Sequence, residues 1–175
     1  LNAGVFGAGV LDCYRVISNV LQKALAALGL QALLVPGKPR GGQKNPARAV
    51  CFSAPSQYEL VIDGCKIAGS AQQRLGQAFL QHGSIPLELD LALLGRALRA
   101  DLNSAVADSL QVVGWLNRYS MEPLSVAQVE TVIAETFAMQ LNVELEESEP
   151  SSAEVEKARK LCDEKYASRQ WNERR

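Results

Sequence analysis

Two side chains in the first half of the chain could carry out group transfer, the thiol of Cys51 and the amine of Lys66. A cysteine thiolate attacks thioesters and can hold an acyl group covalently. Cys51 follows a basic loop, residues 36–48, and cationic neighbours such as Arg48 would favour its thiolate. The competing interpretation of Cys51 is a small buried apolar residue, which is the usual situation of a free cysteine.

Lys66 follows the turn pair Asp63-Gly64 and begins a strand pattern whose later positions carry small side chains. Small side chains let another group lie close to the backbone. A lysine beside such a slot could donate from its ammonium group to a carbonyl or carboxylate oxygen. From the pattern alone, the simpler interpretation is a solvated lysine at a strand edge.

The remaining candidate residues suggest structural roles. His82 could act as a general base, but we expect it to orient strands or to form the wall of that slot. Cys13 and Cys162 lie on expected helices and should be packed, and Cys65 is interpreted as incidental. The cysteine spacing matches no zinc pattern, so we expect no metal site.

The apolar spacing and the turn signals predict an α+β domain in which helices flank an antiparallel sheet. Helices are expected over residues 14–28, 90–100, 104–119, 125–140 and 151–167. Strands are expected over residues 30–35, 49–53, 58–63, 66–71, 78–89 and 142–146. Ser125 with Gln128, and Ser151 with Glu154, are capping boxes that mark two helix starts.

The acidic segment of residues 144–149 suggests a hinge near the C-terminal end. We therefore divide the chain into residues 1–148, the main part of the domain, and residues 149–175, a terminal helix and tail that we expect to pack on it.

Composition excludes several classes of protein. The formal net charge of -1 argues against a nucleic-acid binder. No apolar run is long enough for a membrane span, and residues 1–11 do not match a signal peptide. Four cysteines without a disulfide-like pattern suggest a reducing compartment, and we expect a cytoplasmic protein.

Several motifs agree in order and spacing with one known family. They are Val50-Cys51-Phe52, then Pro55-Ser56-Gln57-Tyr58-Glu59-Leu60, then Asp63-Gly64-Cys65-Lys66-Ile67-Ala68-Gly69-Ser70-Ala71-Gln72-Gln73-Arg74, then Leu80-Gln81-His82-Gly83-Ser84-Ile85, and finally Lys165-Tyr166-Ala167-Ser168 with Trp171-Asn172. Together they resemble the lipoate/octanoate protein ligase and transferase superfamily. The resemblance implies a biotin/lipoate protein ligase-like catalytic domain. The family's Arg-rich, Gly-Gly-containing strand and loop before the first helix is not found, so we expect that the N-terminal part is missing and that the fragment alone could be inactive.

Within that superfamily, the chain is most similar to the ligase-like octanoyltransferases, which carry a cysteine in the Val-Cys-Phe element and use it to hold the acyl group. The resemblance implies that Cys51 and Lys66 are catalytic. It also implies that six residues bind the substrate: Gly69, Ser70, Ala71, Gln72, His82 and Gly83.

The implied reaction moves an octanoyl or lipoyl group from acyl carrier protein to a lysine of a lipoyl-domain protein in protein lipoylation, without a cofactor. The acceptor would be of the glycine cleavage H protein or 2-oxoacid dehydrogenase E2 type. Two alternatives stay open: an ATP-dependent lipoate-protein ligase that needs ATP and Mg²⁺, and a noncatalytic acyl-binding remnant of the same fold.

Overall fold

The computed structural model of the chain divides into two compact units, one up to Val143 and one from Glu144 onward. It describes residues 6, 9–35, 58–76, 78–98, 107 and 110–173. The expected loop at residues 36–48, the expected strand at residues 49–53 and Cys51 lie outside the described residues. Each unit is described by itself.

The first unit begins with helix α1 (Val10–Ala27), which the apolar spacing predicted. The helix ends shortly before Gly29, whose φ of 80° only a glycine adopts without strain. Behind it the amide of Leu30 donates to the carbonyl oxygen of Leu25 at 2.9 Å, which satisfies one of the last helical carbonyls. The chain then enters the first strand.

Strands β1 (Leu33–Val35), β2 (Glu59–Ile62) and β3 (Cys65–Lys66) form an antiparallel sheet in that order. Asp63 and Gly64 both have positive φ, 48° and 76°, in the two-residue turn between β2 and β3. A turn with positive φ at both positions matches the twist of a hairpin, so the predicted Asp-Gly hairpin is confirmed. Every residue of β2 is buried.

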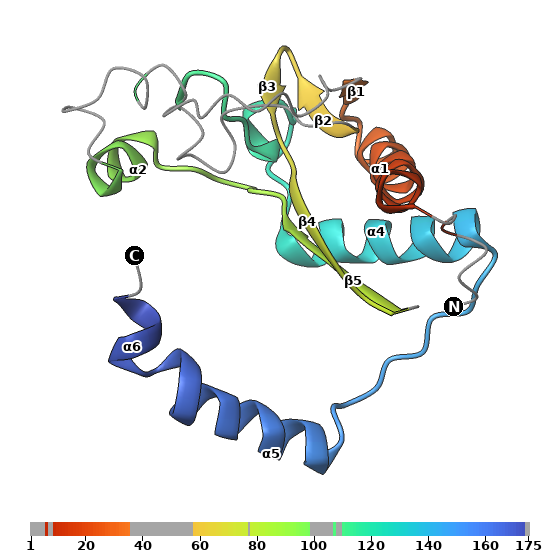
Figure 1. The fold of residues 1–175 in the computed structure, drawn as a ribbon. Coiled ribbons are helices and arrows are strands. Elements are labelled where there is room, and N and C mark those ends of the chain that lie inside the picture. The colour runs from red at the N-terminus through yellow and green to blue at the C-terminus, as the bar shows by residue number, and fades with distance from the viewer. Residues whose placement is uncertain are drawn as a thin grey trace. The chain divides into compact units, whose positions relative to one another are not determined.

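A second antiparallel pair, β4 (Gly69–Leu75) and β5 (Ala78–Ser84), forms a separate two-stranded ribbon (Figure 1). The single strand expected at residues 66–71 is in fact divided between β3 and β4. The strand expected at residues 78–89 ends at Ser84, shortly before Pro86, because proline cannot donate to a strand ladder. The α+β architecture is confirmed.

Two further expected helices of this unit are present. Helix α2 (Leu91–Ala97) starts at Asp90, whose carboxylate accepts from the amide of Leu93 at 2.8 Å. Helix α4 (Val126–Leu141) starts at the predicted capping box of Ser125 and Gln128. Helices α1 and α4 pack side by side in Figure 1.

The helix expected at residues 104–119 is wrong in its second half. Residues 111–115 are not helical, and a short 3₁₀ turn, η4 (Leu116–Arg118), follows them. Val113 instead forms a parallel bridge with Lys66. Backbone pairing with β3 overrides the helical spacing here, and Gly114 gives the room that this pairing needs.

The strand expected at residues 142–146 is also wrong. Asn142 adopts a left-handed conformation (φ 50°, ψ 53°) that caps α4, and residues 144–149 have no regular secondary structure. An αL residue at the helix end turns the chain away from both helix and strand geometry.

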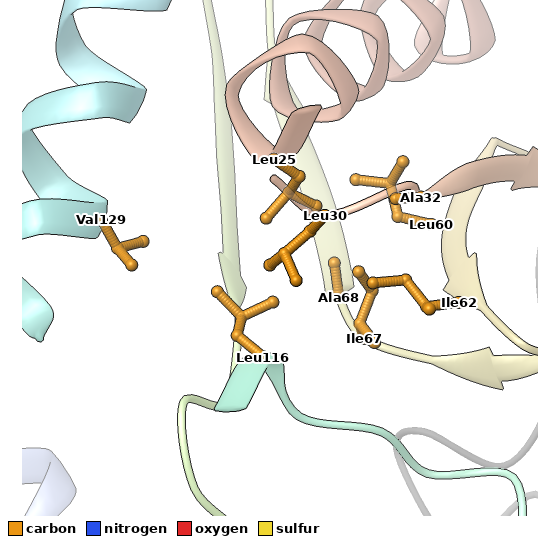
Figure 2. Packing of buried hydrophobic residues seen from close by; sticks show 9 residues of the cluster. All are labelled: Leu25, Leu30, Ala32, Leu60, Ile62, Ile67, Ala68, Leu116 and Val129. Carbon is orange, nitrogen blue, oxygen red and sulfur yellow. The ribbon is translucent and has the colours of Figure 1, made fainter. Parts of the chain in front are cut away.

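The main core of the first unit joins α1, the three-stranded sheet, η4 and α4 (Figure 2). Its buried members are Leu25, Leu30, Ala32, Leu60, Ile62, Ile67, Ala68, Leu116 and Val129. Leu116 and Ile67 are fully buried. This core fixes β3, and therefore Lys66, against the rest of the unit.

The second unit contains α5 (Ser152–Leu161), a π-helical turn η5 (Cys162–Tyr166) and α6 (Arg169–Asn172). Ser151 caps α5 as predicted. Cys162 is exposed, so its expected packing is wrong. Among the described residues, no helix is both long and apolar enough to cross a membrane.

Candidate active site

The backbone of Lys66 is held on both sides. On one side Lys66 pairs with Val61 of β2. On the other, its amide donates to the carbonyl oxygen of Val112 at 2.8 Å, and its carbonyl oxygen accepts from the amide of Gly114 at 2.8 Å. A Cβ atom on Gly114 would lie 2.9 Å from Cγ2 of Ile67, so only glycine fits at this close approach.

The side chain of Lys66 is buried, with 5% of the residue exposed. Its Nζ donates to Oε1 of Glu59 at 2.7 Å, and each side chain of this pair is 6% exposed. The interpretation of Lys66 as a solvated strand-edge lysine is therefore wrong. Burying an ammonium is costly unless a charged partner compensates it, and Glu59 supplies that charge.

The six predicted substrate-binding residues occupy adjoining positions of the β4–β5 ladder. Ser70 pairs directly with Gly83, and Ala71 pairs directly with His82. Gly69 and Gln72 lie on the two neighbouring rungs, opposite Ser84 and Gln81. The structure therefore brings the six together at one end of the ribbon, which begins three residues after Lys66.

Side chains alternate between the two faces of this ribbon. On one face Ala71, Gln73, Leu80 and His82 are exposed, and Leu80 is 64% exposed. On the other face the side chains of Gln72 and Gln81 are hydrogen bonded at 2.8 Å. We refer to the side carrying Ala71, Gln73, Leu80 and His82 as the open face.

A mainly apolar cleft of about 440 Å³ lies between the ribbon and the two packed helices. Four of the predicted residues line it, Gly69, Ser70, His82 and Gly83, whereas Ala71, Gln72 and Lys66 are not among its lining residues. Helix α1 adds Ile17 and Leu21, and α4 adds Val126, Val129, Glu130 and Phe137. His82 belongs both to this cleft and to the open face.

The close pairing of β4 with β5 leaves no room for a side chain at Gly83. A Cβ atom there would lie 2.4 Å from the carbonyl oxygen of Gly69 across the ladder. Real Cβ atoms do not approach backbone this closely, so Gly83 permits the tight pairing of β4 with β5.

Cys65 is buried. Its thiol donates to the carbonyl oxygen of Gln111 at 3.6 Å, and Arg118 donates to its sulfur at 3.9 Å. Burial, followed by the neighbouring Cys65 thiol, raises the pKa of Tyr119 to about 12. The described part of the chain contains no group of three His, Cys, Asp or Glu residues placed to hold a metal ion.

Glu59 was not predicted as the partner of Lys66. A signal was present, because a two-residue turn at Asp63-Gly64 sets the register. This register pairs Val61 with Lys66. Glu59 is two residues before Val61, so its side chain lies on the same face of the sheet as that of Lys66. The part played by residues 112–114 had no comparable signal, since it depends on tertiary pairing.

Comparison with known proteins agrees with this fold. The sequence model of the protein family described as lipoyl protein ligase A/B catalytic domain matches residues 3–138 of this chain. The octanoyltransferase LipM of Bacillus anthracis is 37% identical over 173 residues, which cover 93% of this chain and 61% of that protein. The octanoyltransferase LipM of Bacillus subtilis is 37% identical over 183 residues, covering 96% and 63%. The chain thus spans about three fifths of the length of these relatives.

Two solved structures share the fold. A lipoate-protein ligase A bound with ATP has a TM-score of 0.73 and 21% identity, over 95% of this chain and 60% of that one. A bi-partite lipoate protein ligase of Thermoplasma acidophilum, studied with its E2 lipoyl domain, has a TM-score of 0.67 and 21% identity, over 95% and 59%. At this identity the likeness concerns the fold alone. The match over most of the chain shows that it belongs to the family of lipoyl protein ligase A/B catalytic domains.

Proposed function

We propose that this protein transfers an octanoyl or lipoyl group from acyl carrier protein to a lysine of a lipoyl-domain protein. The observation that carries the proposal is the 37% identity to octanoyltransferases over 93% of the chain. The presence of Cys51 favours the transferase over an ATP-dependent ligase, because a thiol can hold the acyl group without an adenylate.

The proposed reaction has two acyl transfers. The thiolate of Cys51 attacks the carbonyl carbon of the acyl thioester, the bond to the carrier sulfur breaks, and the carrier leaves as a thiol after taking a proton. The amine of the acceptor lysine then attacks the acyl-Cys51 thioester. An amide forms, the amine loses a proton, and the Cys51 thiolate is regenerated.

Both steps pass through an oxyanion at the same carbon. We assign Lys66 to donate to that oxygen, together with nearby backbone N–H groups. An ammonium group has three N–H donors, so pairing with Glu59 is compatible with donation to a substrate oxygen. A donor held by strand pairing on both sides needs little reorganisation when the charge develops.

We place the acyl chain along the open face, beside Ala71, Leu80 and His82. Leu80 offers an exposed apolar surface, and Ala71 leaves space next to His82 on the same rung. The apolar cleft beneath the ribbon is the other place that a medium-length chain could occupy, and substitutions can separate the two.

The first experiment is intact-mass analysis of the full-length protein after incubation with octanoyl-carrier protein. We expect one octanoyl group on the enzyme, its removal by hydroxylamine, and loss or slowing of acceptor modification in Cys51→Ser. Cys162→Ser is the matched control, because Cys162 is an exposed thiol in the second unit. Full transfer by Cys51→Ala, or transfer that requires ATP and Mg²⁺, would overturn the proposal.

Alkylation at neutral pH gives an independent test of the nucleophile. We expect Cys51 to react faster than Cys13, Cys65 and Cys162. Cys13 and Cys65 are buried, so the informative comparison is with exposed Cys162. Peptide mapping over time measures the rates, and faster labelling of Cys65 or Cys162 would argue against an activated Cys51.

A further inference from the structure

We propose that Glu59 is a positioning residue for Lys66, a role that rests on the function proposed above. Its carboxylate holds the Lys66 ammonium where it can meet the oxyanion of both acyl-transfer steps. Glu59 acts through Lys66 and does not itself need to touch the substrate.

The strands on which Glu59 and Lys66 lie are fixed relative to each other. Glu59 begins β2, whose residues are all buried, and β2 is held between β1 and β3. The Nζ–Oε1 distance of 2.7 Å is that of a strong charge-assisted hydrogen bond. Glu59 and Lys66 therefore lie on two paired strands that cannot shift independently of each other.

The buried Glu59–Lys66 pair contributes more to orientation than to stability. A buried ion pair adds little net stability compared with apolar side chains of similar size, because two charges must leave water. The pair does fix the orientation of the lysine side chain. A lysine stem has four rotatable bonds, and a fixed carboxylate selects one arrangement of them before substrate arrives.

Lys66 lies close in the chain to the proposed acyl-binding ribbon. Lys66 ends β3, and the β4–β5 ribbon that carries the proposed acyl-binding residues begins three residues later, at Gly69. Ile67 and Ala68, which connect them, are buried in the core. The positions of the Lys66 backbone and of the ribbon are therefore coupled through a short, packed segment.

The test compares Glu59→Gln and Glu59→Asp with wild type in the full-length protein. Glu59→Gln keeps the size of the side chain and an acceptor oxygen but removes the charge, and Glu59→Asp keeps the charge but withdraws it by one methylene. We expect Glu59→Gln to slow acylation of Cys51 and transfer to the acceptor by about tenfold to a hundredfold. The KM for octanoyl-carrier protein should stay nearly unchanged. Glu59→Asp should recover part of the rate.

A double-mutant cycle with Lys66→Met separates positioning from general damage. If Glu59 acts through Lys66, then Glu59→Gln should have no further effect on the rate in the Lys66→Met background. Glu122→Gln, at an exposed loop position of the same unit, controls for the change of net charge. Circular dichroism and thermal unfolding establish that each variant is folded.

The outcomes are distinct. A Glu59→Gln rate within twofold of wild type, or the same loss in both backgrounds, would overturn the positioning role. If neither Glu59 variant folds, Glu59 is a structural residue and the role is rejected. Failure of the wild-type protein to form any octanoyl adduct would instead remove the proposed function itself, and this proposal with it.

Discussion

The two hairpins of the first unit differ in how they present their side chains. The β2–β3 hairpin is buried: all four residues of β2 lie inside, and Lys66 is 5% exposed. The β4–β5 ribbon is open: five of the seven residues of β5 are exposed, His82 to Ser84 in a row, and Leu80 is 64% exposed. Only a two-residue connection separates them.

This difference suggests a division of work. The proposed charge-bearing donor lies in the packed interior, where its position is fixed and its electrostatic effect is strong. The proposed acyl-binding surface is exposed on the ribbon. Substitutions in the buried hairpin should therefore affect folding and chemistry together, whereas substitutions on the open face should affect substrate binding and leave folding intact.

The largest expected effect is that of Lys66→Ala. From the sequence we would expect this variant to fold normally, since a surface lysine makes little core contact. The structure changes that expectation, because removal of Lys66 leaves the Glu59 carboxylate buried without this partner. We expect a loss of about 3–5 kcal/mol in the free energy of unfolding, measured by urea denaturation.

The paired variant Glu59→Leu/Lys66→Met should recover most of that stability, because apolar side chains can replace a buried ion pair. Its acyl-transfer rate should stay low. A Lys66→Ala protein within about 0.5 kcal/mol of wild type, the range of an ordinary surface substitution, would show that the pair is not a buried unit.

Two glycines allow the hairpins to be compared at the backbone. In Gly83→Ala the new Cβ would lie 2.4 Å from a backbone oxygen, which cannot move without breaking the ribbon. In Gly114→Ala it would lie 2.9 Å from a methyl group of Ile67, in the core. We expect each substitution to cost about 1–3 kcal/mol of unfolding free energy.

The activities of these two variants should differ in kind. Gly114→Ala should lower the rate of the chemical step, because it displaces the segment that binds the Lys66 backbone. Gly83→Ala should mainly raise the KM for octanoyl-carrier protein. Steady-state and single-turnover kinetics measure both quantities. If the two variants change the rate and the KM to the same extent, the buried hairpin and the ribbon do not have separate roles in chemistry and substrate binding.

A smaller effect is expected on the open face. His82→Ala and Leu80→Ala should each change the unfolding free energy by less than about 0.5 kcal/mol, because both side chains are exposed. Both should raise the KM for octanoyl-carrier protein. Leu80 is absent from the cleft lining, whereas Ile17 is part of it. If Ile17→Ala raises the KM and Leu80→Ala does not, the acyl chain lies in the cleft.

The same contrast explains what the sequence could predict. Helices α1 and α4 and the Asp63-Gly64 turn were predicted because their signals are local: apolar spacing, a capping box and a turn pair that needs positive φ. The six ribbon residues were identified from motif resemblance, and the ladder brings them together.

The failures occur where distant segments decide the structure. Residues 111–115 have helical spacing, but pairing of Val113 with Lys66 prevents a helix there. The burial of Lys66 could not be inferred from its own neighbours, because it depends on Glu59 and on residues 112–114. A strand-edge lysine and a buried ion-paired lysine have the same local sequence.

The smallest predicted effect concerns Tyr119, whose ring lies next to Gly114 and Cys65 at the edge of the buried hairpin. Burial, and then the Cys65 thiol, raises its pKa from the ordinary value of 10.0 to about 12. The folded protein thus holds the phenolic proton more tightly than the unfolded chain does. Below about pH 10 both states keep the proton, so Tyr119→Phe and wild type should differ in stability by a constant amount.

As the pH rises from about 10 toward 12, the unfolded tyrosine ionises first, and wild type should lose stability relative to Tyr119→Phe. Urea denaturation of both proteins at pH 8, 10 and 11 measures this divergence. Parallel stability curves over that range would mean that the buried environment of Tyr119 does not favour its neutral form.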